Sequence, residues 1–281
     1  LPYSEAIREG IDQAMSEKQD LIVIGEGVPD PKSIFETTKG LQEKFGKSRV
    51  FDMPLSENGV TGICIGAALN GTPVLMIHQR IDFSLLAMDQ IINNAAKWHY
   101  MFNGQSTVPI VIRVIVGRGW GQGPQHSQNL QALFAHIPGL KVITPATAKD
   151  AKGMMVAALK DKNPVIFIEH RWLHHIEDSV PEEMYFSELD KAQILRQGSD
   201  VTIVANSLMT IETMKAAAVL SEIGVNVEVV DLRSIKPIDL DTILKSVSKT
   251  KKMIVVDSAW KTGGISGEVV SLVVEHGLDL L

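Results

Sequence analysis

The chain has 281 residues, 45% of them apolar and 21% charged, with a formal charge of −6 at pH 7. This balance is typical of a globular protein, and the length suits one large domain or two ordinary ones. The acidic charge argues against nucleic acid or an anionic membrane as a partner. No apolar stretch approaches the roughly 20 residues that span a bilayer. The single cysteine, Cys64, excludes an internal disulfide, favours a reducing compartment, and lies in a small-residue run typical of core packing.

From an amphipathic N-terminal helix onward, short β-branched runs alternate with longer helical patterns. We expect strands at 20–25, 73–77, 108–116, 140–144 and 164–169. Helical patterns lie between them at 33–45, 56–70, 83–103, 127–135 and 147–161. The strand runs are apolar throughout rather than alternating, which suits parallel strands covered by helices on both faces. The pattern therefore predicts an α/β fold with a doubly wound parallel sheet.

A second, smaller α/β unit is expected after a polar stretch. Residues 171–200 have mixed polarity and no sustained period, which indicates a linker on the surface. Strands at 200–206, 225–232 and 251–258 then alternate with helices at 207–223 and 238–249. We therefore predict domains at 1–180 and 198–281, joined by a linker at 181–197. The chain ends in an apolar helical pattern, so it is either a truncated piece or buried at that end against another molecule.

The glycine-rich run "VGRGWGQG" precedes His126, the first candidate functional residue. Its spacing does not fit a dinucleotide fingerprint, because Gln122 and Pro124 stand where the last glycine would be needed. We interpret the run as a loop whose backbone approaches a ligand closely. His126 is expected at the start of the helix at 127–135. There it serves either as a neutral acid–base group or as a histidine bonded only to its neighbours.

Glu57 is the second candidate, at the start of an apolar helix of small residues. One interpretation is a first-turn charge that complements the helix dipole. The other is a partly desolvated carboxyl whose proton affinity rises, as a partner of an aminopyrimidine nitrogen requires. His170 and His174, four residues apart, form a weak metal-site candidate without a third ligand. Neither a nucleophile-elbow serine motif nor a P-loop occurs.

The stretches around Glu57 and His126 resemble a known family over essentially the whole chain. They include "GEGVPDPKSIFETTKGLQEKFGKSRVFDMPLSENGVTGICIGAALNG", "DFSLLAMDQIINNAAKWHYMFNGQ", "QHSQNLQALFAHIPGLKV" and "DAKGMMVAALKDKNPV". The family comprises the β subunits of thiamine-diphosphate-dependent 2-oxo acid dehydrogenases, the decarboxylating component that includes pyruvate dehydrogenase. The resemblance implies a transketolase-like pyrimidine-binding domain followed by a transketolase C-terminal-like domain.

Residue roles follow from this resemblance. It implies that Glu57 hydrogen-bonds N1′ of the cofactor's aminopyrimidine, and that His126 faces the substrate and the lipoyl group. Leu55 and Phe83 match contacts to the pyrimidine, and Gln79 falls at a position where the family often has an apolar residue. A turn resembling the family's potassium site would use backbone carbonyls of Ile110, Ala158, Asp161 and Asn163. The alternative is an ordinary helix C-terminus without an ion.

The resemblance also implies partners. The diphosphate–magnesium motif is absent, and in this family it belongs to an α subunit, so we expect an α2β2 heterotetramer and a lipoyl-bearing acyltransferase. Trp120 and Pro124 add bulk to the glycine loop, and Ile77 replaces a usual acidic residue, so pyruvate is only a default substrate. An acetoin dehydrogenase, a transketolase-like ligase and a non-catalytic scaffold remain alternatives. The expected location is the cytoplasm or, in a eukaryote, the mitochondrial matrix.

Overall fold

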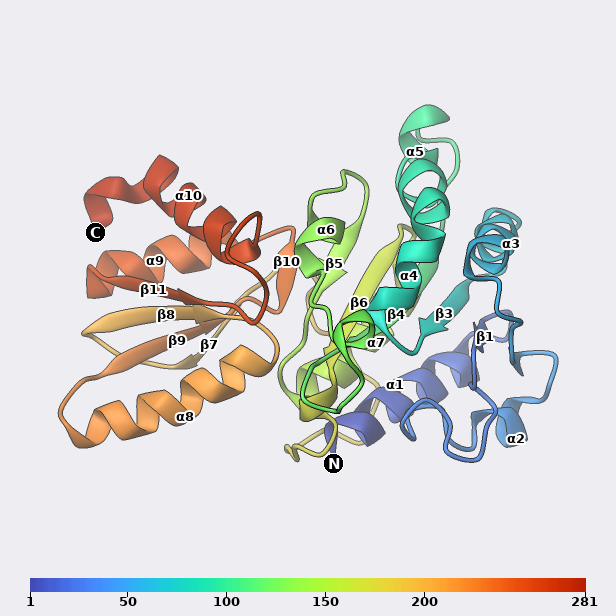
Figure 1. Ribbon diagram of the computed structural model, residues 1–281, viewed down its shortest axis with the longest axis horizontal. Helices are drawn as coiled ribbons and strands as arrows, with labels where there is room; N and C mark the ends of the chain where they lie inside the picture. The colour runs from blue at the N-terminus through green and yellow to red at the C-terminus, as the bar shows by residue number, and fades with distance from the viewer.

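A computed structural model describes residues 1–281, and its strands form two separate sheets (Figure 1). The larger sheet has the strand order β10-β5-β6-β4-β3-β1-β2, and the smaller has the order β11-β8-β9-β7. The strands are β1 Ile22–Gly25, β2 Val50–Phe51, β3 Val74–His78, β4 Ile110–Val116, β5 Lys141–Ile143, β6 Val165–His170, β7 Gln193–Arg196, β8 Val201–Ala205, β9 Val227–Asp231, β10 Ser234–Lys236 and β11 Met253–Val256.

The predicted α/β class is confirmed, with parallel pairing at the centre of both sheets. Every residue of β3, β4 and β6 is buried, because helices cover both faces, and this explains why these strand sequences are mostly apolar rather than alternating. Only β10, paired with β5, and β7, paired with β9, run antiparallel. Neither edge strand was predicted from the sequence, and both lie outside the predicted parallel runs.

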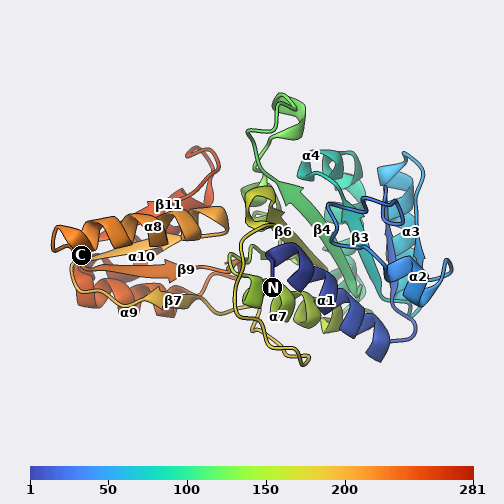
Figure 2. The ribbon, with the colours of Figure 1, turned by 90° about the horizontal axis from the view of Figure 1, so that it is seen from below.

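Helices cover both faces of each sheet (Figure 2). On the larger sheet, α1 and α7 pack against one face, while α3 and the segment 81–101 pack against the other. On the smaller sheet, α8 covers one face, and α9 and α10 cover the other. No helix combines the length and apolar character needed to cross a bilayer. The helices are α1 Tyr3–Glu17, α2 Leu41–Phe45, α3 Glu57–Leu69, α4 Ile81–Ser84, α5 Trp98–Met101, α6 Gln131–Ala135, α7 Ala148–Lys160, α8 Leu208–Glu222, α9 Leu240–Thr250 and α10 Ile265–Gly277.

Three predicted helices are shorter or broken in the structure. The helix predicted at 33–45 is helical only in α2, because Ser33, Phe35 and Glu36 adopt positive φ angles. The helix predicted at 83–103 is divided into α4, a 3-10 turn, a π-helical segment at Gln90–Ala95, and α5. The helix predicted at 127–135 is reduced to α6.

The two sheets are tied together by chain segments that follow the first domain. β7 lies inside the stretch predicted as a linker, and β10 joins the edge of the larger sheet (Figure 1). Between β9 and β10, Arg233 donates from Nη1 to Asp150 Oδ1 at 2.9 Å and from Nε to the Lys191 carbonyl at 2.9 Å. Arg233 therefore connects α7, the linker and the second domain.

Next to Arg233, Asp231 makes the stability of the fold depend on pH. Its carboxyl accepts hydrogen bonds from the Thr210 hydroxyl and the Arg233 amide, but burial raises its pKa to about 7. An unfolded aspartate ionises near pKa 3.9. The folded state therefore binds more protons between these values, and the free energy of unfolding should fall as pH rises from about 4 to about 7. Asp231→Asn should flatten this decline.

The measurement is urea unfolding at pH 5 and pH 8. Asp241→Asn, which changes an exposed aspartate on α9, is the matched control and should keep the wild-type pH dependence. An Asp231→Asn variant that loses as much stability between the two pH values as wild type does would contradict this account of Asp231.

Candidate active site

Four segments meet at the carboxyl edge of the larger sheet, where parallel α/β sheets place their ligands. β1 ends at Gly25, β3 at His78, β4 at Val116 and β6 at His170. A Cβ atom on Gly25 would lie 2.3 Å from the carbonyl oxygen of Ile77, so only glycine allows these strands to end side by side. The candidate site residues follow directly after these strand ends or pack beside them.

A small hollow at this edge brings together three of the predicted residues, Glu57, Gln79 and Phe83. Its wall is completed by Glu26, Met53, Ile77 and His78. Glu57 is the first residue of α3 and is only 9% exposed. The expectation that this carboxyl is partly withdrawn from water agrees with its position. Leu55 lies outside the hollow, with 83% of its surface exposed.

Two residues of the hollow, Glu26 and His78, were not singled out from the sequence. Burial raises the pKa of Glu26, and the neighbouring carboxyls of Glu57 and Asp52 raise it further. Burial lowers the pKa of His78 to about 4, so its ring is neutral at pH 7. Glu26 Oε1 and His78 Nε2 are buried without a hydrogen-bond partner. Unpaired buried polar atoms beside an aromatic ring suit a polar heterocycle as ligand.

His126 reaches the same site through Phe83. The two rings are 5.3 Å apart and nearly perpendicular, in an edge-to-face contact. The predicted helix start was wrong here: His126 ends a 3-10 turn at Pro124–His126, and α6 begins only at Gln131. A helix dipole therefore does not act on this ring. Gln128 does not fix the tautomer of His126 either, because its side-chain Nε2 donates to Asp82 Oδ1 at 2.8 Å.

The histidine pair at 170 and 174 does not form the predicted helical face. His170 ends β6 and accepts a hydrogen bond from the Trp172 amide at Nδ1, 3.2 Å away. His174 is fully buried, with Nε2 3.4 Å from Glu169 Oε1 and Nδ1 2.9 Å from Arg171 Nη1. Each ring serves a different local network, so the metal-ligand interpretation of this pair was wrong.

The turn proposed for potassium closes α7 next to β4. The Ala158 carbonyl accepts from the Asp161 amide at 3.1 Å, and the Asp161 carboxyl accepts from the Asn163 amide at 2.8 Å. Lys141 forms an ion pair with the same carboxyl. Ile110 opens the neighbouring strand β4. The side chains of this turn therefore satisfy one another, which leaves only backbone carbonyls as ligands for an ion.

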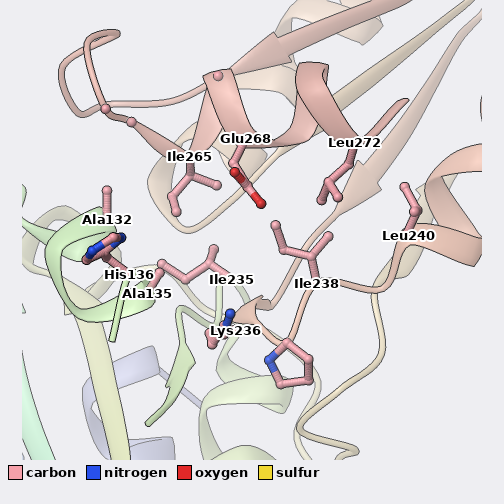
Figure 3. A pocket seen from close by; sticks show the side chains of 14 residues that line it. Ala132, Ala135, His136, Ile235, Lys236, Ile238, Leu240, Ile265, Glu268 and Leu272 are labelled. Carbon is pink, nitrogen blue, oxygen red and sulfur yellow. The ribbon is translucent and has the colours of Figure 1, made fainter. Parts of the chain in front are cut away.

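A much larger cavity lies elsewhere, between the two domains (Figure 3). It has a volume of about 690 Å³ and is lined from α6, β10 and α10, with His136, Lys236 and Glu268 as its charged or titratable side chains. None of the predicted site residues lines it. Glu57 lines the smaller hollow at the sheet edge instead, and His126 adjoins that hollow through its contact with Phe83.

Comparisons with known proteins agree with this geometry. Residues 1–175 match the family model for the pyrimidine binding domain of transketolase, and residues 190–281 match its C-terminal domain. The pyruvate dehydrogenase E1 component subunit beta of Rickettsia felis is 40% identical over 99% of this chain and 85% of its own. The acetoin:2,6-dichlorophenolindophenol oxidoreductase subunit beta of Cupriavidus necator is 42% identical over 98% of this chain and 84% of its own.

A solved structure shares the fold. A split-gene transketolase, described as an inactive beta4 tetramer, superposes with a TM-score of 0.83 over 99% of this chain and 85% of that one. Its sequence identity of 22% supports the architecture alone.

Proposed function

Because the chain belongs to the E1 β-like subunits of thiamine-diphosphate-dependent dehydrogenases in the transketolase family, we propose that it decarboxylates a 2-oxo acid as part of a pyruvate dehydrogenase-like enzyme. The acyl group would then pass to a lipoyl carrier. The observation that carries this proposal is the withdrawn carboxyl of Glu57 in one hollow with Phe83, whose ring contacts His126.

Glu57 is assigned the central role. Thiamine diphosphate, when bound, supplies the electron sink for decarboxylation. Glu57 would hold N1′ of its aminopyrimidine and share a proton there, a task that needs a carboxyl protected from bulk water. Phe83 and Leu55 would contact the ring. Gln79, whose amide donates to the Glu26 carbonyl at 3.0 Å, would complete the wall.

An α subunit is proposed to supply the other half of the site, in an α2β2 heterotetramer with magnesium held mainly by the α chain. Three apolar side chains near this site are exposed: Leu55 (83%), Ile63 on α3 (69%) and Leu86 in the 3-10 turn after α4 (62%). Apolar exposure of this kind is typical of an interface.

We also propose a potassium ion bound to the backbone carbonyls of Ile110, Ala158, Asp161 and Asn163. Cys64 is buried, which raises its pKa to about 12, and a reduced thiol suits the cytoplasm or a mitochondrial matrix.

An acetoin dehydrogenase subunit is the second candidate, because the Cupriavidus necator relative is as similar as the pyruvate dehydrogenase subunits. A transketolase-like ligase and a non-catalytic scaffold are the remaining alternatives. The test is to combine the chain with its α subunit, thiamine diphosphate and magnesium. Carbon dioxide release is then measured from a series of 2-oxo acids, and oxidation is measured with acetoin. Turnover of a 2-oxo acid supports the proposal, acetoin turnover alone supports the second candidate, and no turnover supports a scaffold.

His126 should affect acyl transfer more than cofactor binding. His126→Ala is expected to lower the rate of transfer to a lipoyl acceptor by about 10²-fold, the lower range for loss of an acid–base group. The dissociation constant for thiamine diphosphate should stay within a few-fold of wild type. His136→Ala, at an exposed histidine that lines the cavity between the domains, is the control. A loss of cofactor affinity as large as the loss of transfer rate would instead make His126 a binding residue.

A further inference from the structure

Three arginines at the carboxyl edge of the larger sheet have no carboxylate partner. Arg80 follows β3, Arg118 lies in the glycine loop after β4, and Arg171 follows β6. Of the chain's three buried arginines, Arg113 and Arg233 are paired with Glu169 and Asp150, and Arg80 alone lacks a carboxylate partner; Arg171 is half-buried and Arg118 is exposed. Unpaired guanidinium groups are unusual at a buried position, above all in a protein with a net charge of −6.

Arg80 is the most buried of the three, at 4% exposure, and both of its hydrogen-bond acceptors are neutral. Nη1 donates to the Gly117 carbonyl at 3.4 Å, and Nη2 donates to the side-chain oxygen of Gln122. Its guanidinium carbon lies 5.9 Å from the ring centre of Phe35. Burial lowers the pKa of Arg80; Asp82 raises it, and Arg171 lowers it again. The group is thus desolvated without a neutralising contact.

Arg171 and Arg118 extend this positive region. The guanidinium of Arg171 lies 4.2 Å from the ring centre of Phe35 and 5.2 Å from that of Trp120. Trp120 in turn stacks on Trp172 at 4.3 Å. Trp172 donates from Nε1 to the Arg118 carbonyl at 2.9 Å, so the loop that carries Arg118 is held against Arg171. Arg171 Nη1 is 2.9 Å from His174 Nδ1, a neutral partner at pH 7 because burial lowers the His174 pKa.

This cluster, Arg80, Arg118 and Arg171, adjoins the proposed site. Arg80 donates a hydrogen bond to Gln122, four residues before His126, and Asp82 and Phe83 lie two and three residues after Arg80. We infer that the cluster binds an anionic group, a phosphoryl or a carboxylate, on a molecule that reacts at this site. Guanidinium groups bind both anions through paired hydrogen bonds. The inference rests on the proposed function and specifies one of its substrates.

The anionic group should be remote from the reacting carbon. Strong pairing with the carboxylate that leaves as carbon dioxide would stabilise the ground state and slow decarboxylation. The lipoyl dithiolane is uncharged, so it cannot be the group that neutralises the three arginines. A group that stays charged throughout the reaction fits both constraints. The cluster therefore points to a substrate or acceptor with a second carboxylate or a phosphoryl group.

The test measures anion binding to the chain assembled with its α subunit and cofactor, at constant ionic strength. Trp120 and Trp172 serve as fluorescent reporters, and inorganic phosphate and acetate are titrated separately. Arg171→Met should weaken binding of the preferred anion about tenfold or more, the expected loss of one charged hydrogen-bonding group. Arg171→Lys should keep part of the affinity. Arg118→Met, at an exposed position, gives a second variant with little risk to folding. Arg8→Met, at a half-buried arginine on α1, is the matched control.

The two probes distinguish the sources of the anion. Tighter binding of phosphate identifies a phosphoryl group, and equal or tighter binding of acetate identifies a carboxylate. No saturable binding, or equal affinity in wild type, Arg171→Met and Arg118→Met, overturns the inference. Because this readout needs no turnover, anion binding without decarboxylation would refute the proposed function and leave the cluster's role intact.

Discussion

Glu57→Gln is expected to lower the decarboxylation rate by about 10²- to 10⁴-fold, the range for removal of a positioned acid–base group. The amide matches the size of the carboxyl and keeps its place at the start of α3, so folding should be retained. It cannot share a proton with a ring nitrogen in the same way. The measurement is single-turnover carbon dioxide release by the assembled enzyme at saturating thiamine diphosphate.

Glu5→Gln separates this role from helix-dipole stabilisation. Glu5 is an exposed acidic residue in the first turn of α1, so the two variants remove equivalent charges from helix N-termini. Glu5→Gln should turn over at the wild-type rate. If Glu57→Gln did so as well, Glu57 would be a dipole-complementing residue and the site assignment would fail.

Glu169→Ala is expected to destabilise the protein by about 3–5 kcal/mol, since it leaves Arg113 charged and unpaired in the core. Both side chains are fully buried and form an ion pair between β6 and β4. Arg113 also donates to the Thr37 hydroxyl at 2.6 Å. Burial alone would raise the pKa of Glu169. Charge interactions and hydrogen bonds with Arg113 and His174 have the larger effect and lower this pKa to about 2. The pair's stabilisation is therefore present above about pH 4.3, the unfolded value, and is lost as pH falls towards 2.

Urea unfolding at pH 7 measures this loss. The double variant Arg113→Met/Glu169→Leu removes both charges and should recover most of the stability, because apolar replacement of a buried pair is often neutral or stabilising. If Glu169→Ala kept wild-type stability, or if the double variant were as unstable as the single one, the unpaired charge of Arg113 would not be the cause of the instability.

The sequence predicted the elements whose residues are governed by burial. β3, β4 and β6 are mostly apolar on both faces because helices cover both, and their short length and β-branched residues favour a buried strand over a buried helix. The prediction from the sequence failed where the backbone conformation, rather than the spacing of apolar residues, determines the secondary structure. Phe35 and Glu36 have ordinary helical propensity, yet they adopt positive φ, a choice that tertiary contacts impose.

The candidate site was predictable only in part, for the same reason. Glu57 stands at the start of a recognisable helix, and His126 follows a glycine-rich loop, so both carry local signals. Glu26 and His78 carry weaker signals, because the two residues are brought into one hollow only when β1 and β3 end side by side. A polar residue directly after a buried strand is the signal that would have identified Glu26. Arg80 and Arg171 are likewise brought together only by the sheet.

The most direct test is an experimental structure of the chain assembled with its α subunit and thiamine diphosphate. The account predicts a Glu57 carboxyl oxygen within about 2.8 Å of N1′ of the aminopyrimidine, a charge-assisted hydrogen bond, with the His126 ring facing the thiazolium. A pyrimidine bound beyond hydrogen-bonding reach of Glu57, or a Glu57 side chain turned into bulk solvent, would contradict it.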